Sequence, residues 1–330
     1  MRAFGKWLGR VFLGLVIAIV AIWFLWPREP VDTEIAFDPR ILPENLDVYL
    51  AKEESRFDDI TEGVEKRIIW AGEPGAQTDI AIVNIHGYSA TSEEIRPVPD
   101  DVAKALGANL FYGRLKGHGR ESFGGIAMAE PVAGDWLEDA AEALAIGRRI
   151  GKEVVVITTS TGGTIAAIAA TDPELAEAVK GIVFVSPNFR IKNPTATILE
   201  WPLARTISTL VAGAERSFAP MNDDHQKYWT TIYPTTALIP MAAIVKHARD
   251  ADYSNVTTPG LFIFSDDDAV VDAETTRAIT TKWGGPVTLE PRVMGEGDDP
   301  FNHVIAGDIL SPSQNTETVD IITTWIKELP

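Results

Sequence analysis

The sequence contains no cysteine and only five histidines among its 330 residues. Without cysteine the chain cannot form a disulfide bond, a thiolate nucleophile or a cysteine-ligated metal site. None of the histidines belongs to an H-x-x-H or H-E-x-x-H pair, the spacings at which a helix presents two imidazoles to one metal ion. We therefore expect neither a metal site nor a cofactor.

Positive charge is also scarce in this chain. Its 29 lysines and arginines face 47 aspartates and glutamates, which gives a formal net charge of −18 at pH 7. A chain this acidic repels the phosphates of nucleic acids and the headgroups of anionic lipids, so neither is expected as an electrostatic partner. The hydrophobic fraction of 45% is nevertheless sufficient for a substantial core.

A long hydrophobic run occupies residues 11–26 near the N-terminus. It is somewhat shorter than the ~20 residues that cross a bilayer as a helix, but Trp7, Leu8 and Gly9 can extend it. The bulky residues at its end leave no small-residue site for a signal peptidase, which favours an uncleaved anchor over a cleaved export signal. Basic residues precede the run, and this asymmetry predicts a cytoplasmic N-terminus with the rest of the chain outside.

Predicted strands alternate with predicted helices over most of the chain. The strands are expected at residues 64–70, 79–85, 109–115, 154–157, 181–185, 260–265 and 287–293. The helices are expected at residues 43–57, within 93–106 after its prolines, and at 132–150, 164–170, 273–283 and 317–328. This alternation predicts an α/β fold, with a mostly parallel sheet and helices on both of its faces.

The same pattern divides the chain into segments. Residues 1–30 are the predicted anchor, 31–63 a linker with one helix, and 64–330 the main domain. Within the main domain, residues 188–255 show no convincing strand and are rich in leucine, tryptophan and proline. We expect this insertion to be mainly helical and to cover the carboxyl edge of the sheet.

A candidate nucleophile lies between the strand at 154–157 and the helix at 164–170. There Ser160 precedes Gly162 and Gly163, in the sequence Thr-Thr-Ser-Thr-Gly-Gly. This spacing is typical of a nucleophile elbow, a strained turn that holds a serine hydroxyl above the edge of a sheet. Thr158 stands where the usual pattern has its first glycine. An ordinary polar turn is the alternative interpretation.

Two groups that could activate this serine follow later strands. Asp268 lies in an acidic loop after the strand at 260–265, and His303 follows the last strand. The carboxyl ends of parallel strands share one edge, and a serine there needs an imidazole base that a carboxylate orients. We choose Asp268 because apolar residues 269–271 follow it and could hold it in place, with Asp266 as the second choice and Asp272 as a helix cap. A solvated acidic loop and an ordinary histidine are the alternatives.

The oxyanion of an acyl-transfer intermediate needs two backbone donors near the serine. In a fold with a nucleophile elbow, we expect these donors to be the N–H group of Thr161, which follows the serine, and that of Tyr88, which follows the strand at 79–85. The alternative is that the Tyr88 side chain simply packs in the core. Such packing would not prevent its backbone N–H from serving as a donor.

Six motifs together give the chain a family resemblance. They are His86-Gly87-Tyr88, Arg114-Leu115-Lys116-Gly117-His118-Gly119, Asp135-Trp136, Ser160-Thr161-Gly162-Gly163, Phe264-Ser265-Asp266-Asp267-Asp268-Ala269-Val270-Val271 and His303-Val304. With these motifs the chain resembles the bacterial carboxylesterase and monoacylglycerol lipase group of α/β-hydrolases. The resemblance implies a catalytic triad of Ser160, Asp268 and His303, oxyanion donors at Tyr88 and Thr161, and an insertion that forms a small cap over an apolar acyl pocket. Thr158, the anchor and segment 31–63 depart from the compact soluble members.

The predicted function is a serine hydrolase of carboxylic esters with short to medium acyl chains, with monoacylglycerols among the candidate substrates. Its predicted location is the bacterial inner membrane, crossed once, with the catalytic domain in the periplasm; secretion after cleavage is the alternative. A thioesterase, an acyltransferase or a serine aminopeptidase could use the same triad, and a non-catalytic binding protein could retain the same scaffold.

Overall fold

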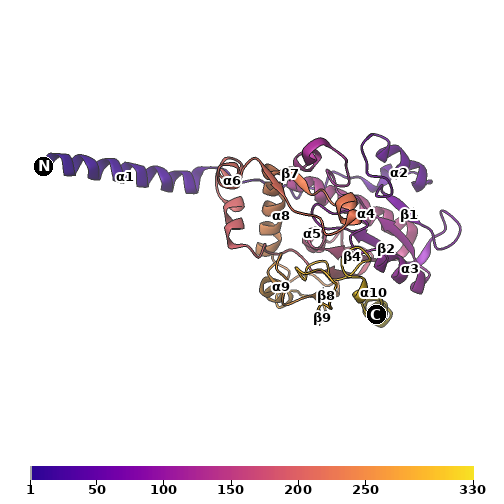
Figure 1. Ribbon diagram of the computed structural model, residues 1–330. Coiled ribbons are helices and arrows are strands. Elements are labelled where there is room, and N and C mark those ends of the chain that lie inside the picture. Colours follow the sequence, from indigo (N-terminus) through magenta and orange to yellow (C-terminus); the bar gives the residue numbers. More distant parts are fainter. Residues whose placement is uncertain (1) are drawn as a thin grey trace.

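The computed structural model describes residues 2–330, without the side chains of residues 2, 3 and 5. Helix α1 (Arg2–Leu25) projects away from the rest of the molecule, as Figure 1 shows. Its segment Lys6–Leu25 is long and apolar enough to cross a membrane, a test that a signal sequence near the N-terminus would also pass.

A seven-stranded sheet forms the centre of the described chain, with the strand order β1-β3-β2-β4-β5-β8-β9. The strands are β1 (Arg67–Ile69), β2 (Thr78–Ile85), β3 (Asn109–Tyr112), β4 (Gly151–Thr159), β5 (Val179–Val185), β8 (Gly260–Phe264) and β9 (Val287–Pro291). Only the pairing of edge strand β1 with β3 is antiparallel within this sheet. The prediction of a mostly parallel sheet is confirmed.

Helices pack on both faces of this sheet. One face carries α4 (Ala133–Ile150), α5 (Thr161–Ala169), α8 (Leu238–Asp250) and α9 (Ala273–Thr280), and the other carries α3 (Val98–Leu106) and α10 (Asn315–Glu328). Strand β4 is continuously apolar because both of its faces are buried. Val154 and Val156 belong to the core cluster on the face that carries α4, here the first cluster, and Val155 and Ile157 belong to the second cluster on the opposite face. A strand buried on both faces has no position for a polar side chain in solvent.

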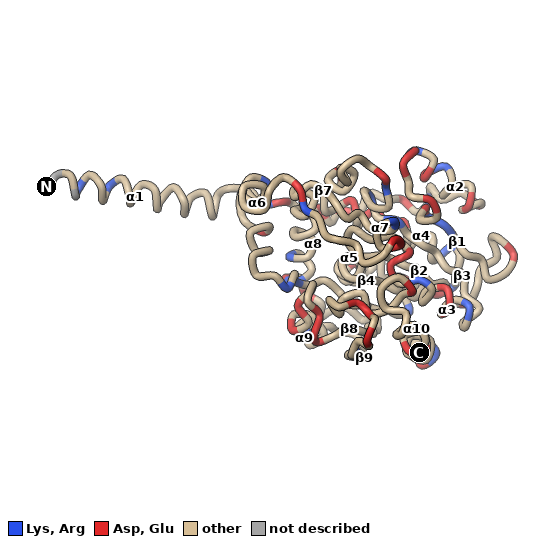
Figure 2. The backbone as a smooth tube through the Cα atoms, in the orientation of Figure 1, with Lys and Arg blue, Asp and Glu red and all other residues tan. Residues whose placement is uncertain are grey.

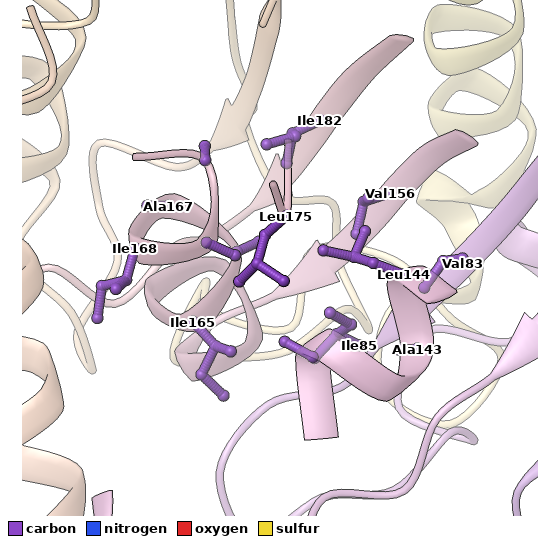
Figure 3. Packing of buried hydrophobic residues seen from close by; sticks show 14 of the residues in the cluster. Val83, Ile85, Ala143, Leu144, Val156, Ile165, Ala167, Ile168, Leu175 and Ile182 are labelled. Atoms are coloured by element: carbon purple, nitrogen blue, oxygen red, sulfur yellow. The ribbon is translucent and has the colours of Figure 1, made fainter. Parts of the chain in front are cut away.

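Small residues allow α5 to approach the sheet closely. Figure 3 shows this packing, in which α5, with Ile165, Ala167 and Ile168, lies beside the strands that carry Ile85, Val156 and Ile182. A Cβ atom on Gly162 would lie 2.2 Å from the carbonyl oxygen of Ile85, so no larger residue fits at the start of the helix. This close approach fixes the turn between β4 and α5.

Several predicted elements are shorter in the structure. Helix α2 (Leu46–Glu54) begins after Asn45, whose side chain accepts a hydrogen bond from the Val48 N–H, and so it does not span 43–57. Helix α3 starts after Pro97, in agreement with a helix that begins at the prolines within 93–106. Three predicted strands are also shortened: 64–70 to β1, 109–115 to β3 and 287–293 to β9.

The prediction that the insertion at 188–255 lacks strands is wrong. Strands β6 (Glu215–Ser217) and β7 (Ile232–Pro234) form a small antiparallel sheet there. Neither strand has a recognisable sequence pattern, because β6 is polar and exposed on both sides and β7 ends in proline. The remaining helices of the insertion are α6 (Ala204–Ala212), α7 (Asp223–Tyr228) and the 3-10 helices η3 (Pro194–Glu200) and η4 (Thr235–Ala237). Further 3-10 helices are η1 (Pro39–Ile41), η2 (Phe123–Ala129) and η5 (Pro312–Gln314).

Segment 31–63 packs against the face of the domain that carries α4. Val31, Ile35 and Phe37 contact the first core cluster. The N–H groups of Ala36 and Phe37 donate to the Glu138 carboxylate at 2.6 and 2.8 Å. The chain is therefore attached to the domain almost from the point at which α1 ends.

Candidate active site

Ser160 occupies a strained turn between β4 and α5. Its backbone angles are φ 50° and ψ −116°, a region that residues other than glycine rarely adopt. Its N–H donates to the Val185 carbonyl at 2.9 Å, and its own carbonyl accepts hydrogen bonds from the N–H groups of Gly163 and Asn188, each at 3.0 Å. These bonds from β5 and α5 hold the serine in the conformation expected of a nucleophile elbow.

A continuous chain of hydrogen bonds links the three residues that the sequence nominated. His303 Nε2 lies 3.0 Å from Ser160 Oγ, and His303 Nδ1 lies 2.8 Å from Asp268 Oδ2. All three side chains are buried. The structure thus brings together residues from the loops after β4, β8 and β9.

The other two aspartates that the sequence offered lie elsewhere. Asp266 is exposed and pairs with Arg277, to which its carboxylate lies at 2.8 Å. Asp272 occupies the N-cap position of α9, as predicted, but its carboxylate accepts from the Thr275 hydroxyl rather than from a backbone N–H. Neither carboxylate makes a hydrogen bond to His303 within the described residues.

Asp268 is fixed by the residues that follow it. Its Oδ1 accepts hydrogen bonds from the N–H groups of Val270 and Val271 at 2.7 and 2.8 Å. The other oxygen, Oδ2, is left to face His303. This arrangement holds the imidazole with its Nδ1 toward the carboxylate and its Nε2 toward the serine.

The sequence did not reveal the role of Asp299, which organises the loop before His303. This buried carboxylate accepts hydrogen bonds from the N–H groups of Phe301, His303 and Val304 at 3.0, 3.0 and 2.9 Å. The signal in the sequence is a short acidic run before Pro300, and glycine, aspartate and proline together also indicate an ordinary turn.

The electrostatic surroundings favour a protonated imidazole at His303. Burial alone would lower the pKa of His303, but the charge and hydrogen bond of Asp268 outweigh it, with smaller contributions from Glu94 and Asp299. The net effect raises the pKa of His303 above its usual value of 6.5. An imidazolium that forms when the serine loses its proton is thereby stabilised.

Glu94 is a second buried carboxyl group that the sequence did not single out. Its Oε2 accepts a hydrogen bond from the Gly87 N–H at 2.6 Å, and burial raises the pKa of Glu94 to about 7. A Cβ atom on Gly87 would lie 2.7 Å from Glu94 Oε1 and 3.1 Å from the Cβ atom of Ser160. Because Gly87 has no side chain, both Glu94 and Ser160 can lie close to the turn at this residue.

The two predicted oxyanion donors border Ser160. Thr161 is the first residue of α5, where N–H groups have no partner within the helix. Tyr88 follows the Gly87 turn, and the hydrogen bonds of residues 2–330 include no acceptor for its N–H. The Tyr88 ring packs edge-on against Trp136 and Tyr233, with centroid separations of 6.2 and 5.7 Å.

Thr158 fits its position as an ordinary strand residue. It is fully buried in β4, and its hydroxyl donates to the Val183 carbonyl of β5 at 2.9 Å. The hydroxyl is therefore engaged within the sheet and makes no hydrogen bond to Ser160.

His86 and His118 are buried beneath the site and hold its loops together. His86 Nε2 accepts from the Leu115 N–H at 3.1 Å, and its Nδ1 lies 2.8 Å from the Gly87 carbonyl. Burial lowers the pKa of His86 to about 4 and that of His118 well below its usual value, so both rings are neutral near pH 7. Over residues 2–330, no cluster of three or more His, Asp or Glu side chains is arranged to hold a metal ion.

Comparison with known proteins identifies one family. Residues 76–289 match the family described as serine aminopeptidase, S33 (Hydrolase_4). No curated protein matches the chain.

Many solved structures share the fold at low sequence identity. One chain from the work on the metagenome-derived lipolytic enzymes LipS and LipT is similar at a TM-score of 0.64 and 18% identity, over 82% of this chain and 99% of the other. A soluble variant of monoglyceride lipase from Saccharomyces cerevisiae gives 0.59 and 12%, over 91% and 99%. The monoacylglycerol lipase of Paleococcus ferrophilus gives 0.56 and 14%, over 79% and 98%. At these identities the likeness establishes the α/β-hydrolase fold, which confirms the predicted fold class.

Proposed function

Because the chain belongs to the serine aminopeptidase S33 family and is a serine hydrolase with the α/β-hydrolase fold, we propose that it hydrolyses carboxylic esters through an acyl intermediate on Ser160. The hydrogen-bonded chain from Ser160 through His303 to Asp268 is the observation that supports this proposal most directly. A binding protein would have no need to hold a buried serine, imidazole and carboxylate in this order.

In the proposed first half-reaction, Ser160 Oγ attacks the carbonyl carbon of the ester while His303 Nε2 takes the hydroxyl proton. The N–H groups of Tyr88 and Thr161 stabilise the resulting oxyanion, and each such donor typically contributes about 3–4 kcal/mol. The tetrahedral intermediate collapses, the C–O bond to the alcohol breaks, and His303 gives its proton to the departing alkoxide. Asp268 fixes the tautomer of His303 and stabilises its positive charge.

In the second half-reaction, His303 takes a proton from water as the water oxygen attacks the acyl group on Ser160. Collapse of this second intermediate releases the carboxylic acid and returns the proton to the serine. The chain needs no further reactant for this cycle, since water supplies both the hydroxyl group of the acid and the proton of the alcohol.

The proposed substrates are esters with short to medium acyl chains, including monoacylglycerols. We propose that the insertion acts as a cap over an apolar acyl pocket, since β7 places Tyr233 against Tyr88 beside the site. The structural neighbours support this choice because they are named as lipolytic enzymes and monoacylglycerol lipases. The family description instead mentions aminopeptidase activity, which would require cleavage of an aminoacyl amide.

A substrate panel tests the proposal. We expect the full-length enzyme to have a higher kcat/KM for p-nitrophenyl and glyceryl esters than for matched thioesters or aminoacyl amides. Ser160→Ala should abolish this hydrolysis. Ser186→Ala is a matched control, because Ser186 is also a buried serine with positive φ at the end of a strand, in this case β5. Undiminished hydrolysis by Ser160→Ala would disprove the role of the serine, and a preference for amides would favour the aminopeptidase.

We also propose that α1 is an uncleaved membrane anchor with a cytoplasmic N-terminus. The apolar helix Lys6–Leu25 supports this proposal. The full-length protein should then remain in the membrane fraction after alkaline carbonate extraction, and deletion of residues 1–30 should release it. Recovery of an N-terminally shortened soluble protein would instead indicate cleavage and secretion.

A further inference from the structure

The chain leaves very little free length between α1 and the domain. The helix ends at Leu25, and Val31 already packs against the core. Asp32, the next residue, packs closely against α4, since a Cβ atom on Gly134 would lie 2.8 Å from the Asp32 carbonyl oxygen. The intervening residues could span at most roughly 20 Å when fully extended, at ~3.5 Å per residue. If α1 is the membrane anchor proposed above, the domain is held against the membrane surface.

Two contacts determine which face of the domain lies nearest to the end of α1. Trp23 packs edge-on against Trp201 of the insertion, with ring centroids 5.5 Å apart. Glu29 accepts a hydrogen bond from Arg205 Nε of α6 at 3.0 Å. Figure 1 shows the result: α1 leaves the domain beside α6, while α2 and β1 lie away from this junction.

The surface at this junction is apolar and exposed. Helix α6 presents Leu210 and Val211, which are 81% and 66% exposed, and Arg205 is its only charged residue. Figure 2 shows most of α6 and the adjoining part of α1 without charged residues, although the chain as a whole is strongly acidic. Exposed apolar side chains that gather in one patch mark an interaction site, whereas isolated ones are ordinary on a protein surface.

Further exposed apolar side chains occur along the insertion, beside the exposed Glu215 and Arg216 of β6. The Thr235 hydroxyl donates to the Gly213 carbonyl at 2.7 Å, which attaches the end of α6 to the end of β7. On the other side of β7, a Cβ atom on Gly125 of η2 would lie 2.0 Å from the Ile232 carbonyl oxygen, so η2 and β7 are in direct contact. The side chains of Ile232, Phe123 and Ile126 are exposed there.

We propose that this surface, formed by Leu210, Val211, Phe123, Ile126 and Ile232 and called here the apolar patch, rests in the headgroup and outer acyl region of the lipid leaflet at which α1 ends. Helix α6 itself carries no acidic residue, and Glu29 beside it is paired with Arg205, so this end of the patch adds little repulsion from lipid headgroups. Apolar side chains beside a membrane anchor gain free energy by entering the interface, as in interfacial helices.

The patch is connected to the candidate active site. Tyr233 follows Ile232 on β7 and packs against Tyr88, and the N–H of Thr230 donates to the Ser89 carbonyl at 2.7 Å. Seating the patch in the bilayer therefore places the loop that carries one proposed oxyanion donor next to the membrane. The source of the ester substrate would then be the lipid leaflet rather than the surrounding solution.

The lack of cysteine makes a direct test possible, because any introduced cysteine can be labelled selectively. Val211→Cys and Val48→Cys form a matched pair: both valines lie on nine-residue helices, α6 and α2, and they are 66% and 63% exposed. Each full-length variant would carry an environment-sensitive fluorophore and be reconstituted in phosphatidylcholine vesicles that contain nitroxide-labelled phosphatidylcholine.

We expect the label at position 211 to show blue-shifted emission and several-fold stronger nitroxide quenching than the label at position 48. Equal quenching at the two positions would overturn the proposal. A blue shift at position 211 without quenching would also overturn it, since that result indicates burial against a protein, such as a second copy of this chain.

A second measurement separates this inference from the proposed function. The double variant Leu210→Glu/Val211→Glu should lower the ratio of activity on vesicle-embedded monoacylglycerol to activity on a soluble short-chain ester by several-fold, whereas Val48→Glu should leave it unchanged. An unchanged ratio in the double variant would contradict the docking of the patch. If the enzyme hydrolysed neither ester, the proposed function would fail, but the quenching experiment would still decide whether the patch meets lipid.

Discussion

At the scale of single residues, the chemistry depends on the proton of His303. The imidazole lies between the Ser160 hydroxyl and the Asp268 carboxylate, and it must be neutral to accept a proton from the serine. Because its pKa is raised above 6.5, part of the enzyme is inactive in mildly acidic solution.

We expect kcat/KM for a neutral ester to rise with pH, with a midpoint above 6.5 that reports the free enzyme's imidazole. Asp268→Asn removes the charge that raises this pKa, so it should move the midpoint to lower pH and reduce kcat by about 10³-fold or more. The exposed Asp266 offers a control, and Asp266→Asn should change neither quantity. A pH profile with the same midpoint in wild type and Asp268→Asn would contradict this assignment.

Glu94 makes a separate contribution to stability. Its pKa is 4.5 in the unfolded chain and about 7 when folded, so the folded state binds the proton more tightly. This contribution is fully favourable below pH 4.5 and is lost as the pH rises to 7, with a magnitude of up to about 3 kcal/mol.

Glu94→Gln should therefore reduce the fall in the free energy of unfolding between pH 5 and pH 8, because glutamine can accept the Gly87 hydrogen bond but does not titrate. Denaturant titrations at the two pH values would measure this change. Glu121→Gln, at an exposed site, should leave the pH dependence as in wild type. An identical pH dependence in Glu94→Gln would show that the glutamate is ionised in the folded protein over this whole range.

At the scale of elements, the turn between β4 and α5 depends on the absence of a side chain at Gly162 and on the hydrogen bond that the Thr158 hydroxyl makes to β5. The Ile85 carbonyl oxygen is backbone and cannot move away from a larger residue at position 162. Thr158, in contrast, occupies the place of the usual first glycine without crowding the turn, because its hydroxyl bonds to the neighbouring strand.

We expect Gly162→Ala to destabilise the fold by about 3 kcal/mol or more, since a methyl group 2.2 Å from a carbonyl oxygen displaces α5 from the sheet. Gly72→Ala should be neutral because nothing lies within 4 Å of the added carbon. Thermal denaturation of the two variants would measure the difference. Similar melting temperatures would show that the helix can shift at no cost.

Thr158→Gly should lower stability by roughly 1–2 kcal/mol, because it removes a hydrogen bond and puts a flexible residue into a central strand. Turnover should stay close to that of wild type once the variant is folded. A large change in kcat at unchanged KM would instead show that Thr158 tunes the reactive serine.

The elements that could be predicted from the sequence are those with a strong local signal. Strand β4 was identified by its continuous apolar run, and the order of Ser160, Asp268 and His303 could be read because each follows a strand at one edge of the sheet. Glu94 and Asp299 could not be identified in this way, since their roles arise from contacts with backbone N–H groups that only the folded loops bring near. Strands β6 and β7 are three residues each and carry no alternation of polar and apolar residues that would distinguish them from loops.

At the scale of the whole molecule, the sequence predicted an anchor and a domain, but not their relative arrangement. The composition predicts a chain that avoids anionic surfaces, whereas the structure places beside α1 a helix, α6, with a single charged residue. The position of this end beside α1 depends on contacts between Trp23 and Trp201 and between Glu29 and Arg205, which are far apart in the sequence.

The central claim is that Ser160 is the nucleophile of a serine esterase. Labelling of the full-length enzyme with a fluorophosphonate, followed by mass mapping of the modified peptide, tests this claim most directly. We predict one adduct per chain, on Ser160, with its formation abolished by Ser160→Ala, strongly slowed by His303→Ala and unaffected by Ser186→Ala. An adduct on another residue, or equal labelling of the Ser160→Ala variant, would contradict the account.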